Sequence, residues 1–314
     1  MSTEPSLQVR RVLRTEPERL VVEVRRDGGA WEAVDGEHPL GLASPYRDEV
    51  DLERNRTPGA GDGTVVLPVT PLSFRDFMLY EKHAVDAARQ MARRYLPRLY
   101  PVTAAYERVT RSVFPRFRPA PLWYRQPIYY FGNALTFVPS GTPVSAPSYA
   151  DALDYELELG FVLSRPLLDA TPAEAEAAIG AFVVVNDFSA RNVQIAEMRS
   201  GFGPQKAKHF LSSMSSTATR AADILPRVDR LGASVRVNGK TVARTGTGGM
   251  RFSLGEALAH ASRSERLLPG ELFATGTLPG GSGLETGVRL CPGDRLELEI
   301  DSVGVIEHLV VKEA

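Results

Sequence analysis

Two patterns of apolar residues alternate along the chain. DYELELGFVL (154–163), which ends in the apolar run GFVL, and the apolar run in AFVVVND (181–187) are both predicted to be strands. The second run is apolar up to its last two residues, which favours a strand covered on both faces. Near the C-terminus, DRLELEID (294–301) and VGVIEHLVV (303–311) are also predicted to be strands.

Helices are predicted between these strands. TPAEAEAAIG (171–180) opens with a capping box and ends at a glycine. SLGE (253–256) opens another capped helix. The stretch from about Phe74 to Arg94 is expected to be a helix with Ser73 as its N-cap. Strands therefore alternate with helices in the middle third of the chain.

The N-terminal part differs in composition from the remainder. Residues 7–34 are expected to form short strands around a turn, and a stretch rich in Gly, Pro and Arg follows as far as RNRTPGAGDG (54–63). We interpret that stretch as a linker. The predicted division is a small β-rich domain with its linker over residues 1–68 and a main domain over residues 69–314.

Composition narrows the possible classes of protein. The 314 residues contain 37 basic and 38 acidic side chains, so no overall charge attracts nucleic acid or a membrane surface. No apolar run is long enough to span a bilayer, and the first residues lack a signal peptide's apolar stretch. Cys291 is the only cysteine, which excludes an intrachain disulfide and a cysteine-based metal site. We expect a cytoplasmic protein.

Glu156 and Glu158 are the first candidates for chemistry. They are two residues apart on a predicted strand, so their side chains leave the same face. The same spacing occurs at Glu297 and Glu299, which are expected to face water while Leu296, Leu298 and Ile300 face inward. This is the commoner arrangement. The first pair differs because its strand continues into the apolar run GFVL.

A third carboxylate follows at the end of the next strand, where Asp187 comes directly after AFVVVN. Carboxylates gathered beside apolar strands repel one another and lose hydration, which costs several kcal/mol. A divalent cation bound by Glu156, Glu158 and Asp187 removes that cost. Because the ligands are all oxygen atoms, Mg²⁺, Mn²⁺ or Ca²⁺ is favoured over Zn²⁺.

The motifs DYELELGFVL, VVNDFSARNVQ, GPQKAKHF and FATGTLPGG, in that order, resemble the fumarylacetoacetate hydrolase family. The resemblance covers about residues 70–314. It implies an α+β fold, which is a mixed β-roll with flanking helices, preceded by a small β-rich N-terminal domain and usually assembled as a homodimer.

The resemblance also assigns roles to residues, which we take as expectations. It implies Asp76 as a further metal ligand beside Glu156, Glu158 and Asp187. It implies a catalytic group of His83, Lys208 and Gln194, and substrate contacts from Tyr130 and from Thr277 in FATGTLPGG.

At three positions the chain departs from the family pattern. Ala92 stands where the family has a substrate-binding arginine, and Met198 replaces a pocket tyrosine. We expect Arg93, adjacent to Ala92, and Met198 to contact the substrate. The acid that partners the histidine has no clear match, because Ser282 holds the aligned place and Glu285 lies three residues further on. Glu81 is an alternative acid partner for His83.

The arginine-rich segment 89–118 has two interpretations. It is either a solvated face or a lid that attracts an anionic substrate.

The implied activity is metal-dependent hydrolysis of a C–C bond in a β-diketo acid, an acylpyruvate or a fumarylacetoacetate-like substrate, through a metal-bound enolate. The alternative is a decarboxylase, hydratase or isomerase that acts on a related 2-keto acid with the same residues. A non-catalytic metal-dependent binding protein is the third alternative. The partner in every case is a small anionic keto acid, without nucleic acid or membrane.

Overall fold

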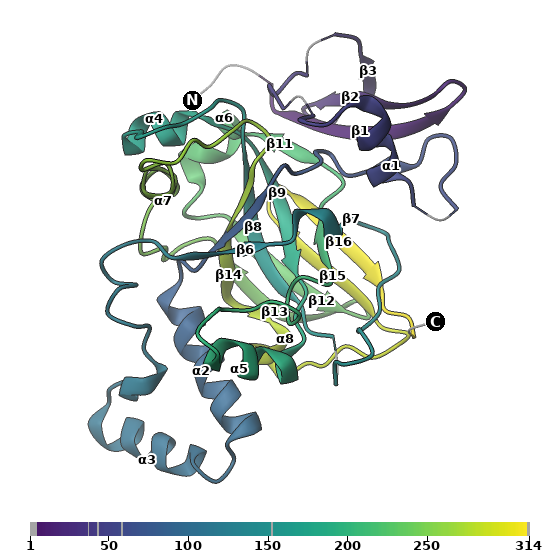
Figure 1. Cartoon of the computed structure of the whole chain (residues 1–314). Helices are drawn as coiled ribbons and strands as arrows, with labels where there is room; N and C mark the ends of the chain where they lie inside the picture. The colour runs from purple at the N-terminus through teal and green to yellow at the C-terminus, as the bar shows by residue number, and fades with distance from the viewer. Residues whose placement is uncertain (1–4, 37, 43, 58, 152, 313–314) are drawn as a thin grey trace.

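A larger and a smaller β-sheet form the centre of the molecule, with helices at their edges (Figure 1). The computed structural model describes residues 5–36, 38–42, 44–57, 59–151 and 153–312. The larger sheet contains β1 (Leu7–Thr15), β2 (Glu18–Arg26), β3 (Glu32–Val34), β4 (Val65–Val66), β5 (Phe74–Phe77), β6 (Tyr129–Gly132), β7 (Phe137–Pro139), β8 (Glu156–Leu163), β9 (Ile179–Asp187), β10 (Ser212–Met214), β11 (Ala218–Arg220) and β14 (Leu272–Ser282). The smaller sheet contains β12 (Gly232–Val237), β13 (Lys240–Gly246), β15 (Arg295–Ile300) and β16 (Gly304–Leu309).

Along its main path the larger sheet runs β3–β2–β1–β11–β9–β8–β14–β5–β6. The pairs β14/β5 and β7/β10 are parallel, whereas β8 is antiparallel to both β9 and β14. The helices are α1 (Asp48–Asn55), α2 (Glu81–Tyr95), α3 (Tyr100–Thr110), α4 (Pro172–Ala177), α5 (Arg191–Arg199), α6 (Ala221–Ile224), α7 (Leu254–Ala261) and α8 (Gly283–Thr286), with 3₁₀ turns η1 (Pro115–Phe117), η2 (Ala134–Thr136) and η3 (Leu225–Arg227). The predicted α+β class is confirmed. Within the part of the chain that the structure describes, no helix has the length and apolar character that a membrane span needs.

The register between β8 and β9 sorts apolar and acidic residues onto definite faces. Glu158 lies opposite Val185 and Gly160 lies opposite Val183, so the even-numbered residues of β8 share a face with the odd-numbered residues of β9. Leu157, which lies on the other face of β8, packs into the main hydrophobic core. If β8 shifted by one residue against β9, Glu156 and Glu158 would enter that core and Leu157 would leave it. Because both faces of β8 are buried, this cost fixes the register.

The predicted helix from Phe74 to Arg94 is wrong at its start. Residues 74–77 form β5, all four side chains are buried, and helix α2 begins only at Glu81. Ser73 does not cap a helix, because its hydroxyl donates to Glu271 at 2.7 Å. Pairing with β14 on one side and β6 on the other decides the conformation of this segment, and this pairing is not visible in the local sequence.

Both predicted capping boxes are confirmed, at Thr171 for α4 and at Ser253 for α7. However, α4 ends at Ala177, and Gly180 lies in β9 rather than at the end of the helix. A Cβ atom at Gly180 would lie 2.6 Å from the Cβ atom of Ser164, so a close approach between neighbouring chain segments requires this glycine.

The N-terminal strands continue the larger sheet, because β1 pairs with β11 (Figure 1). The predicted linker is partly helical, since α1 covers residues 48–55. Buried Arg11 fixes α1 to this region by donating to Asp51 at 2.8 Å and to the carbonyl oxygen of Leu67 at 2.7 Å. The division into domains at residue 68 stays a prediction.

The comparison pair, Glu297 and Glu299, lies on β15 of the smaller sheet. Leu296, Leu298 and Ile300 are buried as predicted, and the two glutamates are partly exposed. Both bind Arg236 across the sheet. This E-x-E pair therefore has an ordinary surface role.

Gly160→Ala tests the register of β8 and β9. Its Cβ atom would lie 2.5 Å from Cγ2 of Val185 and 2.7 Å from Cγ2 of Val183, so we expect a loss of roughly 1–3 kcal/mol from overpacking. The midpoint of urea unfolding measures this loss. The matched control is Gly61→Ala, where no atom lies within 4 Å of the added Cβ atom. Equal midpoints for the two variants would contradict the close packing at Gly160.

Candidate metal centre and active site

Three carboxylates meet inside the larger sheet. Asp76 comes from β5, Glu158 from β8 and Asp187 from the end of β9, and one oxygen atom of each lies within 4.8 Å of the others. All three side chains are buried. The strands bring them together because β14 alone separates β5 from β8, and β9 is the other neighbour of β8.

A bulge in β14 lets these strands approach one another. Gly276 has φ of +80°, and a Cβ atom there would lie 2.4 Å from the carbonyl oxygen of Phe77. Thr277 then stands opposite Glu158 and donates its hydroxyl to that carboxylate at 3.3 Å. Glycine is required here both for the backbone conformation and for the close approach to β5.

Each of these carboxylates has an oxygen atom that is buried and accepts no hydrogen bond: Oδ1 of Asp76, Oε2 of Glu158 and Oδ1 of Asp187. Burial, and then the charge of Asp187, raises the pKa of Asp76 well above its usual value. Burial, and then the charge of Asp76, does the same to the pKa of Glu158. Buried acceptors without partners are costly, and a hard divalent cation is the group that this donor set fits.

Glu156 lies beside this cluster but has different partners. Its Oε1 atom accepts from Arg191 at 2.7 Å, and its Oε2 atom accepts from Lys208. Burial opposes ionisation of Glu156, but Arg191 and then Lys208 outweigh burial and lower its pKa. Both oxygens of Glu156 are therefore engaged, and its role as a metal ligand stays a prediction.

Lys208 joins Glu156 to the cluster. Its Nζ atom also lies 2.6 Å from Oδ2 of Asp187. Burial disfavours the charged ammonium, but Asp187 and Glu156 outweigh burial and raise the pKa of Lys208. A permanently charged ammonium thus lies at the edge of the site.

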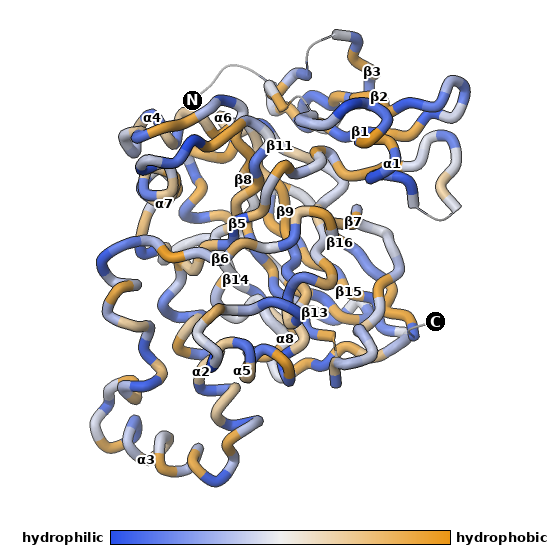
Figure 2. The backbone as a smooth tube through the Cα atoms, viewed as in Figure 1, coloured by the Kyte–Doolittle hydropathy of each residue, from blue (hydrophilic) through white to orange (hydrophobic). Residues whose placement is uncertain are grey.

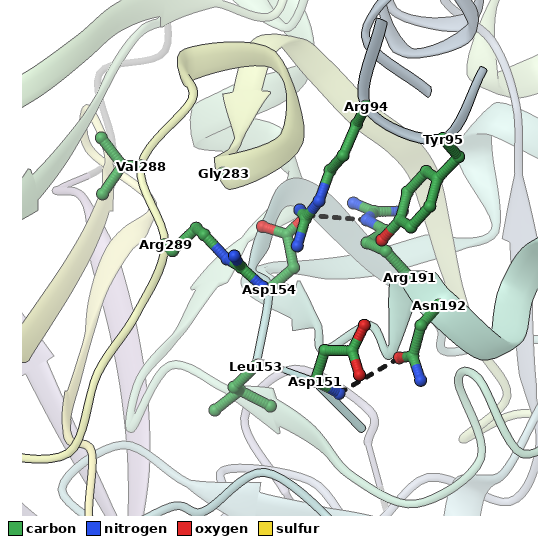
Figure 3. Close-up of a pocket in the computed structure, with 10 residues that line it drawn as sticks. All are labelled: Arg94, Tyr95, Asp151, Leu153, Asp154, Arg191, Asn192, Gly283, Val288 and Arg289. Carbon is green, nitrogen blue, oxygen red and sulfur yellow. Dashed lines mark hydrogen bonds and ion pairs between the residues drawn. The ribbon is translucent and has the colours of Figure 1, made fainter. Parts of the chain in front are cut away.

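Asp154 binds the guanidinium group of Arg191, as Figure 3 shows. The Nε atom of Arg191 donates to Asp154 at 2.6 Å, and the same carboxylate accepts from the backbone N–H of Leu284 at 3.0 Å. Burial disfavours the guanidinium charge, but Glu156 and Asp154 outweigh burial and raise the pKa of Arg191. Asp154 therefore positions Arg191, and Arg191 positions Glu156.

His83 lies in the first turn of α2 and is buried at the site. Its Nδ1 atom lies 2.9 Å from Oε2 of Glu285, and its Nε2 atom lies 3.9 Å from Oε1 of Glu156. Glu285 is itself fixed, because it accepts from Ser282 at 2.7 Å and from the backbone N–H of Gly280 at 2.9 Å. When Nδ1–H donates to Glu285, Nε2 is the atom left to accept a proton.

Glu81 is not the partner of His83. It is exposed and binds the hydroxyl group of Tyr124, because residues two apart on a helix point in different directions. Arg93 is also exposed and does not line the cleft described below, which α2 lines with positions such as Ala88, Met91 and Ala92 instead. The structure thus brings neither Glu81 nor Arg93 to the site.

The other residues expected at the site do lie there. Tyr130, on β6, donates its hydroxyl to Oδ2 of Asp187 at 2.5 Å. Gln194, on α5, accepts from Arg191 at 2.9 Å, and both Gln194 and Met198 line the adjoining cleft. Burial, and then Asp187, raises the pKa of Tyr130, so its hydroxyl stays protonated as a donor.

Three contributors to the site were missed or left open by the sequence. Arg191 and Asp154 lie inside the motifs VVNDFSARNVQ and DYELELGFVL, but a charged residue in a motif gives no sign that it is buried. Glu285 was noted near the aligned place of the acid that partners the histidine, but it was not assigned to that role. Its signal was its position just after β14, in the short helix α8, which contacts α2.

The site opens into a cleft of about 1030 Å³. Strands β5, β6, β8 and β14 supply its deep end, and helices α2, α3 and α5 supply much of its walls. Asp76, Glu158, Lys208 and His83 all line it, so the reactive groups are accessible to a small molecule.

Residues 98–311 match the family model of the fumarylacetoacetate hydrolase C-terminal domain. The chain belongs to this family.

Two curated relatives are mitochondrial oxaloacetate tautomerases. One from Xenopus laevis is 30% identical over 188 residues, which are 60% of this chain and 59% of the relative. One from Homo sapiens is 28% identical over 155 residues, which are 49% of this chain and 70% of the relative. The chain thus spans less than two thirds of the length of the frog relative.

Solved structures extend the likeness to nearly the whole chain. Fumarylacetoacetate hydrolase from Exiguobacterium antarcticum superposes with a TM-score of 0.68 at 18% identity, covering 98% of this chain and 100% of the other. A 2-hydroxyhepta-2,4-diene-1,7-dioate isomerase from Mycobacterium marinum gives 0.66 at 20% identity, covering 98% and 99%. At such identities the superpositions show the shared fold, and the predicted family fold is confirmed.

Addition of Mg²⁺ or Mn²⁺ after treatment with EDTA is expected to raise the melting temperature of the wild type. Binding to the native state alone stabilises by about 2.7 kcal/mol at a hundredfold excess over Kd. Asp76→Asn and Glu158→Gln should reduce or remove the shift, whereas Glu297→Gln with Glu299→Gln should keep it. A wild-type melting temperature that neither metal moves would contradict the site.

Without metal, stability is expected to fall as pH rises. The carboxyls of Asp76, Glu158 and Asp187 have raised pKa values in the folded state, so the native protein binds more protons than the unfolded chain. Their stabilising effect is complete below the unfolded values of roughly 3.9–4.3 and is lost as pH rises through the folded values.

Melting curves in EDTA over this range measure the effect, and Glu158→Gln, which removes one titrating group, should flatten the slope. A wild-type slope that equals the slope of Glu158→Gln would contradict the assignment.

Proposed function

We propose that this protein is a metal-dependent hydrolase that cleaves the C–C bond of an acylpyruvate. The observation that carries the proposal is the buried pair of His83 and Glu285 beside the carboxylate cluster. A histidine whose Nδ1 atom is fixed by a carboxylate presents Nε2 as a general base. His83 lines the cleft, whose volume of about 1030 Å³ is enough for a substrate and a water molecule.

Asp76, Glu158 and Asp187 would hold the cation, with Glu156 as a further ligand. When bound, a divalent cation supplies Lewis acidity toward the oxygen atoms of the substrate's 2-oxo acid group. The orphaned oxygens of the three carboxylates support this placement.

The chain's own residues account for the movement of protons. His83 takes a proton from water through Nε2, and the water oxygen bonds to the distal acyl carbon of the substrate. The bond from that carbon to the neighbouring CH₂ group breaks, and the electron pair stays on the CH₂ carbon. The proton held by His83 then passes to this carbon. The products are a carboxylic acid and pyruvate, so one water is consumed and no oxidant is needed.

Lys208 and Gln194 would stabilise negative charge during this reaction. Both line the cleft, and Lys208 is a charged donor fixed by Glu156 and Asp187. Donors held in position before reaction stabilise developing negative charge without a cost of reorganisation.

A keto–enol tautomerase is the second candidate. The oxaloacetate tautomerases among the curated relatives favour it. It needs the same cation and a base that moves a proton between carbon and solvent, and His83 would serve there too. Tautomerisation breaks no C–C bond and adds no water, so the two candidates differ in their products.

His83→Ala tests the proposal. Loss of a positioned general base should lower kcat on an acylpyruvate by roughly 10²–10⁴. The metal-induced rise in melting temperature should remain, because the residues that would hold the metal are Asp76, Glu158 and Asp187 and not His83. The matched control is His260→Ala, a histidine on α7 outside the cleft, which should keep wild-type kcat.

Hydrolysis in ¹⁸O-labelled water should place the label in the new carboxylic acid, and mass spectrometry measures it. Decay of the enol absorbance without acid or pyruvate would support the tautomerase instead. If His83→Ala keeps full activity while the wild type incorporates label, His83 is not the base.

A further inference from the structure

Much of the wall that helices α2 and α3 give to the cleft is apolar. Helix α2 supplies Ala84, Ala87, Ala88 and Met91, and α3 supplies Val102. In Figure 2 apolar segments recur along α2 and α3, in the helical arm that extends away from the sheets. Arg89 holds this arm together by binding Glu107 of α3, on positions that do not line the cleft.

Several of these apolar side chains remain uncovered. Leu99 is 58% exposed, Val102 is 65% exposed, and Met198 on α5 is 52% exposed, although all three line the cleft. Apolar side chains gathered on a concave surface that continues into a reactive site are typical of a ligand-binding wall.

The cationic groups of the cleft lie elsewhere. At the deep end, Lys208 and Arg191 are already bound to carboxylates. The remaining arginines that line the cleft, Arg116, Arg118 and Arg199, are exposed and form no ion pair among the described residues. A short dicarboxylate bound at the deep end would place its second carboxylate beside alanine and methionine side chains, where no cation compensates its lost hydration.

We propose, on the basis of the function proposed above, that the substrate is an acylpyruvate whose acyl group is a large apolar chain or ring. The 2-oxo acid end lies at Asp76, Glu158 and Asp187, and the acyl group extends along α2 toward α3. The cleft volume of about 1030 Å³ agrees with this class, because clefts for drug-sized ligands measure roughly 300–1,000 Å³. The exposed arginines attract the anionic substrate to the entrance.

The length of the acyl group should therefore set the rate at low substrate concentration. Each methylene buried against the wall is expected to raise kcat/KM by up to roughly fourfold, which corresponds to about 0.8 kcal/mol. The increase should stop when the chain reaches the end of the wall.

The experiment measures kcat/KM of the full chain with Mg²⁺ for acetyl-, hexanoyl- and decanoylpyruvate and for oxaloacetate. A fifth substrate has the length of decanoylpyruvate but ends in a carboxylate. We expect the rate to rise from acetyl- to decanoylpyruvate and to be lowest for oxaloacetate. Ala87→Phe, which fills the wall, should lower the decanoyl-to-acetyl ratio at least tenfold. The matched control is Ala105→Phe on α3, an exposed alanine outside the cleft, which should leave the ratio unchanged.

The outcomes separate this inference from the function on which it rests. Cleavage of acetylpyruvate without an increase with chain length would overturn the apolar wall and leave the hydrolase standing. Preference for the chain that ends in a carboxylate would do the same, and would assign recognition to the arginines. Failure to cleave any acylpyruvate would overturn both. If Ala87→Phe changes the oligomeric state in size-exclusion chromatography but not the ratio, the wall contacts a second copy of the chain, and the inference is wrong.

Discussion

The structure depends on the burial of acidic side chains inside a sheet. Asp76, Glu158 and Asp187 lose their hydration, lie within a few ångströms of one another, and keep oxygen atoms that no protein group satisfies. The pairing of β5, β8, β9 and β14 holds these mutually repelling groups in place, together with Lys208 at Asp187. A folded protein tolerates the free-energy cost of burying unpaired carboxylates where the surrounding structure compensates for it. Here a divalent cation would be the missing partner of the unpaired oxygen atoms.

The remaining charges of the site are arranged around this constraint. Lys208 bridges Glu156 and Asp187, and Asp154 fixes Arg191 against Glu156. These contacts occupy Glu156 and leave the unsatisfied oxygens on the other three carboxylates. The pair of His83 and Glu285 adds a proton acceptor at the border between this charged end and the apolar cleft.

The sequence predicted the parts of the site that local patterns control. Strand alternation placed Glu156 and Glu158 on one face, and the comparison with Glu297 and Glu299 correctly separated a buried pair from a surface pair. It could not predict that residues 74–77 form a strand, because that choice depends on pairing with distant β14 and β6. For the same reason Glu285, which follows β14, could not be assigned to a histidine about two hundred residues earlier in the chain.

A crystal grown from metal-free protein and soaked in Mn²⁺ tests the central claim most directly, through the anomalous difference map at the manganese edge. The account predicts a single strong peak at bonding distance from oxygen atoms of Asp76, Glu158 and Asp187. Lys208 should stay bound to Glu156, whether or not the cation displaces it from Asp187. A map without a peak among these carboxylates at saturating Mn²⁺, or with its strongest peak elsewhere, would contradict it.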